Sequence, residues 1–171
     1  MFTKLISPVT GFIRRTGEQV KWLTTFLVLL VFCDALARYL FSASSAWTTD
    51  LEWHVFALIF LFGAAYALQE DQHVRVDVWY GKWTARRQAW VDLIGILCLL
   101  LPWCIIVIYT GFRYAETSFA IGEGSPDPGG LPARWIIKGA IGVGFVLLLL
   151  QAVASAFRAL GTLLSPTTPG R

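Results

Sequence analysis

A few charged residues stand inside or at the ends of long apolar runs, where a charge is costly and often functional. Asp34 and Arg38 are four residues apart, so on a helix they share one face and can form an ion pair. Glu52 precedes the run HVFALIFLFGAAYAL, and His73 and Asp77 follow it. An ion pathway is one interpretation of Asp34 and Arg38. A structural ion pair, within the helix or to a partner subunit, is the favoured one.

Other chemistry finds little support in these residues. His73 and Asp77 lack a third or fourth ligand at usable spacing, so no metal site is predicted. The sequence has no Ser-His-Asp order, no Gly-rich phosphate loop and no nucleotide fingerprint. The three cysteines lie inside apolar segments, and their odd number argues against a disulfide framework. We therefore expect neither a cofactor nor an enzymatic activity.

The composition is that of an integral membrane protein. Hydrophobic residues make up 56% of the chain and charged residues 15%, against roughly 25% charged in ordinary globular proteins. Eight tryptophans, many near the ends of apolar runs, favour contact with the membrane–water interface. The net charge of +3 is spread along the chain, which gives no support to a nucleic-acid partner. The expected surroundings are a lipid bilayer.

The apolar runs predict an all-α fold with four transmembrane helices. Residues 22–158 form the predicted membrane domain, preceded by a cytoplasmic segment 1–21 and followed by a disordered cytoplasmic tail 159–171. Pro102 should kink the third span, because it removes a backbone hydrogen bond. The four predicted spans are residues 22–41, 53–69, 92–112 and 135–157.

The connections between the spans predict their orientation. Lys and Arg number four in residues 1–21 and four in the 69–87 connection, whereas residues 42–52 have none. The positive-inside rule therefore places both termini and the 69–87 connection in the cytoplasm, and the 42–52 and 113–134 connections outside. Short interfacial helical segments are expected before the first span and within residues 69–87. The stretch HVRVDV in that connection also has a strand-like alternation.

Several short stretches together match the pattern of a known family. The spacing between the Gly-Ala-Ala stretch and His-Val-Arg-Val-Asp is fairly specific, and the Gly-Leu-Pro-Ala-Arg-Trp stretch is a second anchor. The stretches are Ala37-Arg38-Tyr39, Trp47 with Glu52, Gly63-Ala64-Ala65, His73-Val74-Arg75-Val76-Asp77 and Gly130-Leu131-Pro132-Ala133-Arg134-Trp135. On these residues the sequence resembles, over about residues 22–158, the small permease subunit of tripartite ATP-independent periplasmic (TRAP) transporters. At the position of Asp34 the family often has asparagine.

The resemblance implies one subunit of a three-part uptake system in the bacterial inner membrane. A periplasmic binding protein captures the substrate, an organic acid such as a carboxylate. A large permease subunit carries the sites for the substrate and the coupling ion, usually sodium. This small subunit would brace the large one and offer periplasmic surface to the binding protein.

The resemblance also suggests roles for individual residues, beside purely local structural ones. Arg38, Glu52 and Arg134 are candidates for polar contacts on the periplasmic side. His73, Arg75 and Asp77 are candidates for fixing the cytoplasmic end of span two. The full set of candidate structural or subunit-interface residues is Asp34, Arg38, Glu52, Gly63, His73, Arg75, Asp77, Arg134 and Trp135.

Two other functions remain open at this point. A self-sufficient small transporter, working as a homo-oligomer, would need an essential acid within the membrane, and Asp34 is the only candidate. A membrane-embedded enzyme or electron carrier would need a bound cofactor.

Overall fold

The structure is a computed structural model that describes residues 2–70 and 80–164, with side chains from residue 7 onward within those ranges. The described chain is helical, as predicted. Four continuous helical stretches are long and apolar enough to cross a membrane: Ser7–Phe41, Ala46–Gln69, Ala85–Ala120 and Trp135–Leu164. The elements are α1 (Phe2–Phe41), α2 (Ala46–Gln69), α4 (Ala85–Gly95), the π-helical turn η1 (Ile96–Leu100), α5 (Leu101–Ala120) and α6 (Trp135–Leu164).

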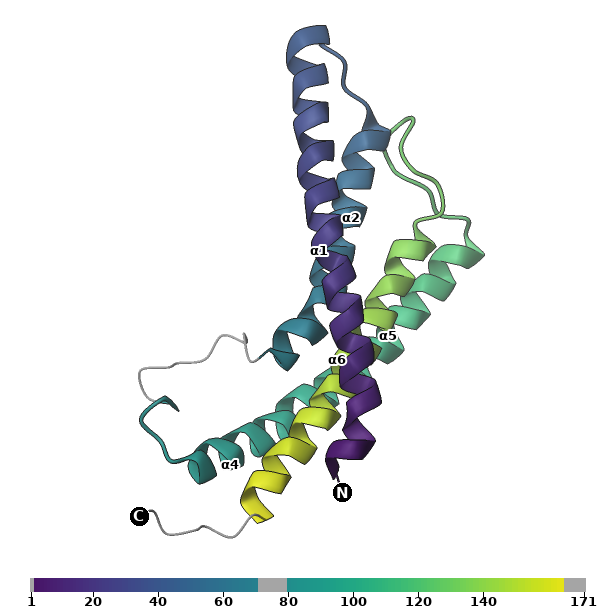
Figure 1. Cartoon of the computed structure of the whole chain (residues 1–171). Helices are drawn as coiled ribbons and strands as arrows, with labels where there is room; N and C mark the ends of the chain where they lie inside the picture. Colours follow the sequence, from purple (N-terminus) through teal and green to yellow (C-terminus); the bar gives the residue numbers. More distant parts are fainter. Residues whose placement is uncertain (1, 71–79, 165–171) are drawn as a thin grey trace.

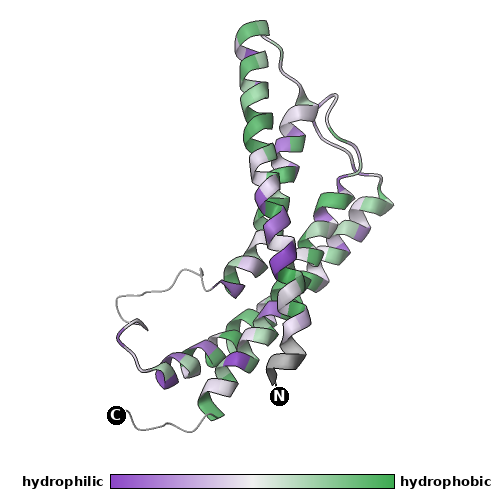
Figure 2. Cartoon of the chain, in the orientation of Figure 1, coloured by the Kyte–Doolittle hydropathy of each residue, from purple (hydrophilic) through white to green (hydrophobic). Residues whose placement is uncertain are grey.

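The helices form two pairs that meet at α6. α1 and α2 stand side by side, and α5 pairs with α6 at an inclination to them (Figure 1). α6 also contacts α1, α2 and α4, so it is the central helix. The beginning of α1 and the end of α6 lie toward the same lower end in Figure 1, and the 121–134 loop reaches the start of α2 at the upper end. Most helical residues are hydrophobic, with hydrophilic residues in the lower half of α1 and in α4 (Figure 2).

The helices extend beyond the predicted spans. α1 has 40 residues, about 60 Å at 1.5 Å per residue, so the expected surface helix before span one is continuous with that span. In the same way α5 continues to Ala120 and α6 to Leu164. Part of the expected tail is therefore helical.

Small residues allow the helices to approach closely, as is common in membrane bundles. A Cβ added at Gly144 of α6 would lie 2.9 Å from the Leu61 Cβ of α2. Gly17 of α1 lies directly against the Tyr66 side chain, with no room for a methyl group between them. A Cβ at Gly63, by contrast, would make only an ordinary contact of 3.9 Å with Val20. Gly63 is thus not a point of close approach within the chain.

The predicted irregularity at Pro102 takes the form of a π-helical turn just before it. In η1 the Leu101 N–H donates to the Ile96 carbonyl, one residue further back than in an α-helix. Pro102 has no N–H to continue the α-helical series, so a shift in the hydrogen-bond register at this point is expected.

Candidate functional site

A group of hydrogen-bonded residues connects the start of α2 to the loop that precedes α6. We call it the loop cluster and define it as Asp50, Glu123, Ser125, Leu131 and Lys138. Asp50 is only 8% exposed. Its Oδ2 accepts a hydrogen bond of 2.9 Å from the Leu131 N–H, and the Ser125 hydroxyl also hydrogen-bonds to this carboxylate. One buried carboxylate therefore holds two points of the loop.

An ion pair forms the second half of the loop cluster. Lys138, in the first turn of α6, is 9% exposed, and its Nζ donates to Glu123 Oε2 in the loop. The same Nζ lies 3.8 Å from the ring centroid of Tyr114, a cation–π contact with α5. Because a buried ammonium requires partners, this arrangement joins α5, the loop and α6 at one place.

Electrostatics favour the ionised form of Glu123. The hydrogen bond from Lys138 is the main cause that lowers the pKa of Glu123 below its ordinary value of 4.5. The positive charges of Lys138 and Arg134 act in the same direction. Glu123 is therefore a carboxylate at neutral pH, and the ion pair is fully formed there.

This geometry explains why Gly130 begins the Gly-Leu-Pro-Ala-Arg-Trp stretch, and two further residues of the stretch contribute backbone hydrogen bonds. A Cβ at Gly130 would collide with the Ser125 and Asp50 side chains, so only glycine fits. The Leu131 N–H donates to Asp50, and the Leu131 carbonyl accepts a hydrogen bond of 3.0 Å from the Ser125 N–H. The backbone N–H of Arg134 donates a hydrogen bond of 3.0 Å to the Glu123 carbonyl. This bond connects the beginning of the loop to the start of α6.

Arg134 and Trp135, two of the predicted site residues, therefore lie beside the loop cluster. Arg134 contributes its backbone and a positive charge near Glu123. Trp135 begins α6 and packs edge-on against Phe119 of α5, with ring centroids 5.3 Å apart. Their contacts within the chain fix the relative position of α5 and α6.

The Asp34–Arg38 ion pair exists within α1, separate from the loop cluster. Asp34 Oδ2 and Arg38 Nη2 are 2.5 Å apart. The Asp34 side chain is 7% exposed and the Arg38 side chain 60% exposed, so the carboxylate packs inward while the guanidinium extends to the surface. Glu52 is partly buried, and its Oε1 has no hydrogen-bond partner among the described residues.

His73, Arg75 and Asp77 lie outside the described residues, so their predicted role at the end of span two stays a prediction. Sequence reasoning missed the loop cluster, although two signals were present. Lys138 is a lysine in the first turn of an apolar helix, and Asp50 is an acid before span two. Each needs a partner if buried, but the partners are 15 and 81 residues away in the chain.

Comparison with known proteins gives two findings. Residues 27–162 match the family described as "Tripartite ATP-independent periplasmic transporters, DctQ component". The chain is also similar to the C4-dicarboxylate TRAP transporter small permease protein DctQ of Vibrio cholerae serotype O1 (strain ATCC 39315 / El Tor Inaba N16961). The two are 27% identical over 108 residues, which are 58% of this chain and 46% of the relative. The match thus spans about half of the relative's length.

Proposed function

The chain belongs to the DctQ component family of TRAP transporters, and we propose that it braces a large permease subunit during ion-driven uptake of an organic acid. Membership places it among multi-pass inner-membrane transport components rather than enzymes. The proposal includes two partners, a large permease and a periplasmic binding protein. It also includes sodium as the coupling ion and the bracing role of this chain.

The bracing role is supported by the contacts of the buried charged side chains, which are all made within the chain. Among the described residues the buried charged side chains are Asp34, Asp50 and Lys138. Each is engaged inside the chain: Asp34 with Arg38, Asp50 with the loop, and Lys138 with Glu123. Asp34 acts within α1, whereas Asp50 and Lys138 fix the loop to two helices, and such fixed contacts suit a rigid support. A transport path needs polar groups that are free to exchange partners with a moving ion.

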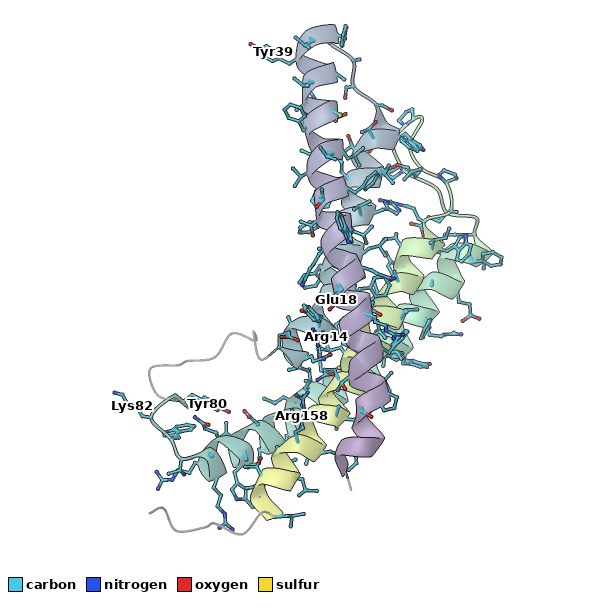
Figure 3. All side chains as sticks on the ribbon, viewed as in Figure 1. Arg14, Glu18, Tyr39, Tyr80, Lys82 and Arg158 are labelled. Atoms are coloured by element: carbon cyan, nitrogen blue, oxygen red, sulfur yellow. The ribbon has the colours of Figure 1, made fainter. Side chains whose placement is uncertain are left out.

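The distribution of basic residues supports a periplasmic position for the loop cluster. Arg14, Lys82 and Arg158 lie in the lower half of the view, toward the beginning of α1 and the end of α6, whereas Tyr39 projects near the upper end (Figure 3). By the positive-inside rule the lower end faces the cytoplasm. The 121–134 loop then faces the periplasm, where it would offer a fixed surface to a binding protein.

The substrate class rests on the similar proteins. The Vibrio relative is named for C4-dicarboxylates, which fits the organic acid that the family resemblance implies. We propose a carboxylate substrate whose binding site lies in the large subunit.

Uptake by proteoliposomes tests this function. The large permease is reconstituted with and without this chain, and uptake of a radiolabelled C4-dicarboxylate is measured with an inward sodium gradient and the cognate binding protein. We expect uptake only when this chain is present. Equal uptake without it would contradict the proposal, and so would uptake by this chain alone.

A further inference from the structure

An open groove with a volume of about 620 Å³ runs along the outer face of α5. Such a volume lies within the roughly 300–1,000 Å³ range of small-molecule sites. Ile105, Ile108 and Tyr109 of α5 form its apolar wall, and Leu149 of α6 closes it from the other side. Ile105 is 59% exposed and Tyr109 68% exposed, so the wall is open to the surroundings of the protein.

The groove changes character along its length. Its α5 residues recur every three or four positions from Ile105 to Glu116, which places them on one face of the helix. These eleven steps cover about 16 Å, close to half of the roughly 30 Å hydrocarbon thickness. The apolar wall ends in the charged residues Arg113 and Glu116, on the side of the 121–134 loop. A lipid molecule in one leaflet has the same order, because its acyl chains lie in the hydrocarbon core and its charged headgroup lies at the membrane surface.

The charged end carries one positive and one negative group. Arg113 Nη1 lies 2.8 Å from Glu116 Oε2, and the two side chains are 64% and 66% exposed. An exposed pair of this kind contributes little on its own, so both groups can turn to a ligand at small cost. Guanidinium binds phosphate well through paired hydrogen bonds. A carboxylate next to it accepts hydrogen bonds from an ammonium group.

We propose that this groove binds a phospholipid with a zwitterionic ethanolamine headgroup. One acyl chain lies along Ile105, Ile108 and Leu149, the phosphate pairs with Arg113, and the primary amine pairs with Glu116. A phosphoglycerol headgroup carries the same phosphate but offers no cation to Glu116, so that carboxylate is left without a charged partner beside the phosphate. A choline headgroup has no N–H to donate. The charge pair therefore selects ethanolamine lipids over both.

Native mass spectrometry of the purified full chain in detergent tests the proposal. Phosphatidylethanolamine, phosphatidylglycerol and phosphatidylcholine with identical acyl chains are added separately, and the retained lipid is measured. We expect preferential retention of one phosphatidylethanolamine. Glu116→Gln should lower that retention about tenfold, the usual effect of losing one charge-assisted hydrogen bond, and Arg113→Gln should lower it similarly.

The chain offers a matched control in a second exposed ion pair. Arg14 and Glu18 on α1 are 3.1 Å apart, with side chains 66% and 52% exposed. Arg14→Gln and Glu18→Gln should leave retention unchanged. Equal retention of the three lipids, or equal losses in the control variants, would overturn the proposal.

A photo-crosslinking residue at position 108 in the membrane of intact cells separates a lipid from a protein in the groove. Crosslinks to phosphatidylethanolamine support the proposal. Crosslinks to a large membrane protein, with no lipid adduct, would show that a partner helix fills the groove and would refute it.

Discussion

Asp50 Oδ2 accepts a hydrogen bond of 2.9 Å from the backbone N–H of Leu131, a residue 81 positions further along the chain. This contact connects α2 to the loop between α5 and α6, so it links the two helix pairs at one end of the molecule. Together with the Lys138–Glu123 ion pair it makes the loop part of the folded scaffold.

Replacing Asp50 with alanine should loosen the 121–134 loop. The Leu131 N–H would lose its acceptor, and an unsatisfied buried donor costs about 1–3 kcal/mol. We expect a lower thermal unfolding temperature in detergent and faster hydrogen exchange at Leu131. Asp127→Ala is the control, because Asp127 is exposed in the same loop. Equal effects of the two substitutions would show that Asp50 does not hold the loop.

The Lys138–Glu123 pair should make the loop sensitive to acid. The folded-state pKa of Glu123 is lowered, chiefly by the Lys138 hydrogen bond, from an ordinary value of 4.5. A lowered folded pKa means that the contribution to stability is present above pH 4.5 and is lost as the pH falls through the folded pKa. Thermal unfolding, followed from neutral pH downward, should show this loss. Glu123→Gln should reduce the pH dependence below 4.5, and an unchanged profile would contradict the assignment.

Two glycines of α1 should respond in opposite ways to alanine. Gly11 has open space where a Cβ would be, so Gly11→Ala should stabilise the helix by up to about 1 kcal/mol through helix propensity. Gly17 lies against the Tyr66 side chain, so Gly17→Ala should cost about 1–3 kcal/mol through overpacking. The thermal unfolding temperatures of the two variants, compared with that of the unchanged protein, test both predictions. A stabilised Gly17→Ala variant would show that α1 does not pack on Tyr66 in this way.

Asp34→Asn should have a mild effect on uptake by the assembled transporter. Asn keeps a side-chain oxygen that can accept a hydrogen bond from Arg38, so the contact within α1 loses its charge but not its geometry. Uptake in the proteoliposome assay should fall by less than about threefold, less than the loss of a charge-assisted hydrogen bond would cause. Complete loss of uptake would instead favour an essential membrane acid and the self-sufficient transporter.

The sequence was enough to predict the four helices, because each contains a strongly apolar stretch of membrane length. The predicted ends of the helices were less accurate than the predicted number of helices. Glycine disfavours helix interiors, yet α1 is continuous through Gly11 and Gly17, and Gly17 packs against the Tyr66 side chain of α2. That contact joins residues 49 positions apart, and local propensity carries no information about it.

The candidate site was predictable only in part, for the same reason. The Asp34–Arg38 pair follows from helical spacing, and the structure has it. The partners of Asp50 and Lys138 depend on how a loop folds back over two helix pairs, which no periodicity encodes. Gly63 was a predicted interface residue, but the close approaches on either side of it in α2 are made at Leu61, by Gly144 of α6, and at Tyr66, by Gly17 of α1.

Co-purification tests the central claim most directly. A tagged copy of this chain is expressed together with the candidate large permease at native levels, extracted in mild detergent, and isolated through its tag. We predict that a large, multi-span membrane protein elutes with it in a fixed ratio. Isolation of the tagged chain only as a free oligomer, under conditions in which the large protein is present and folded, would contradict the account.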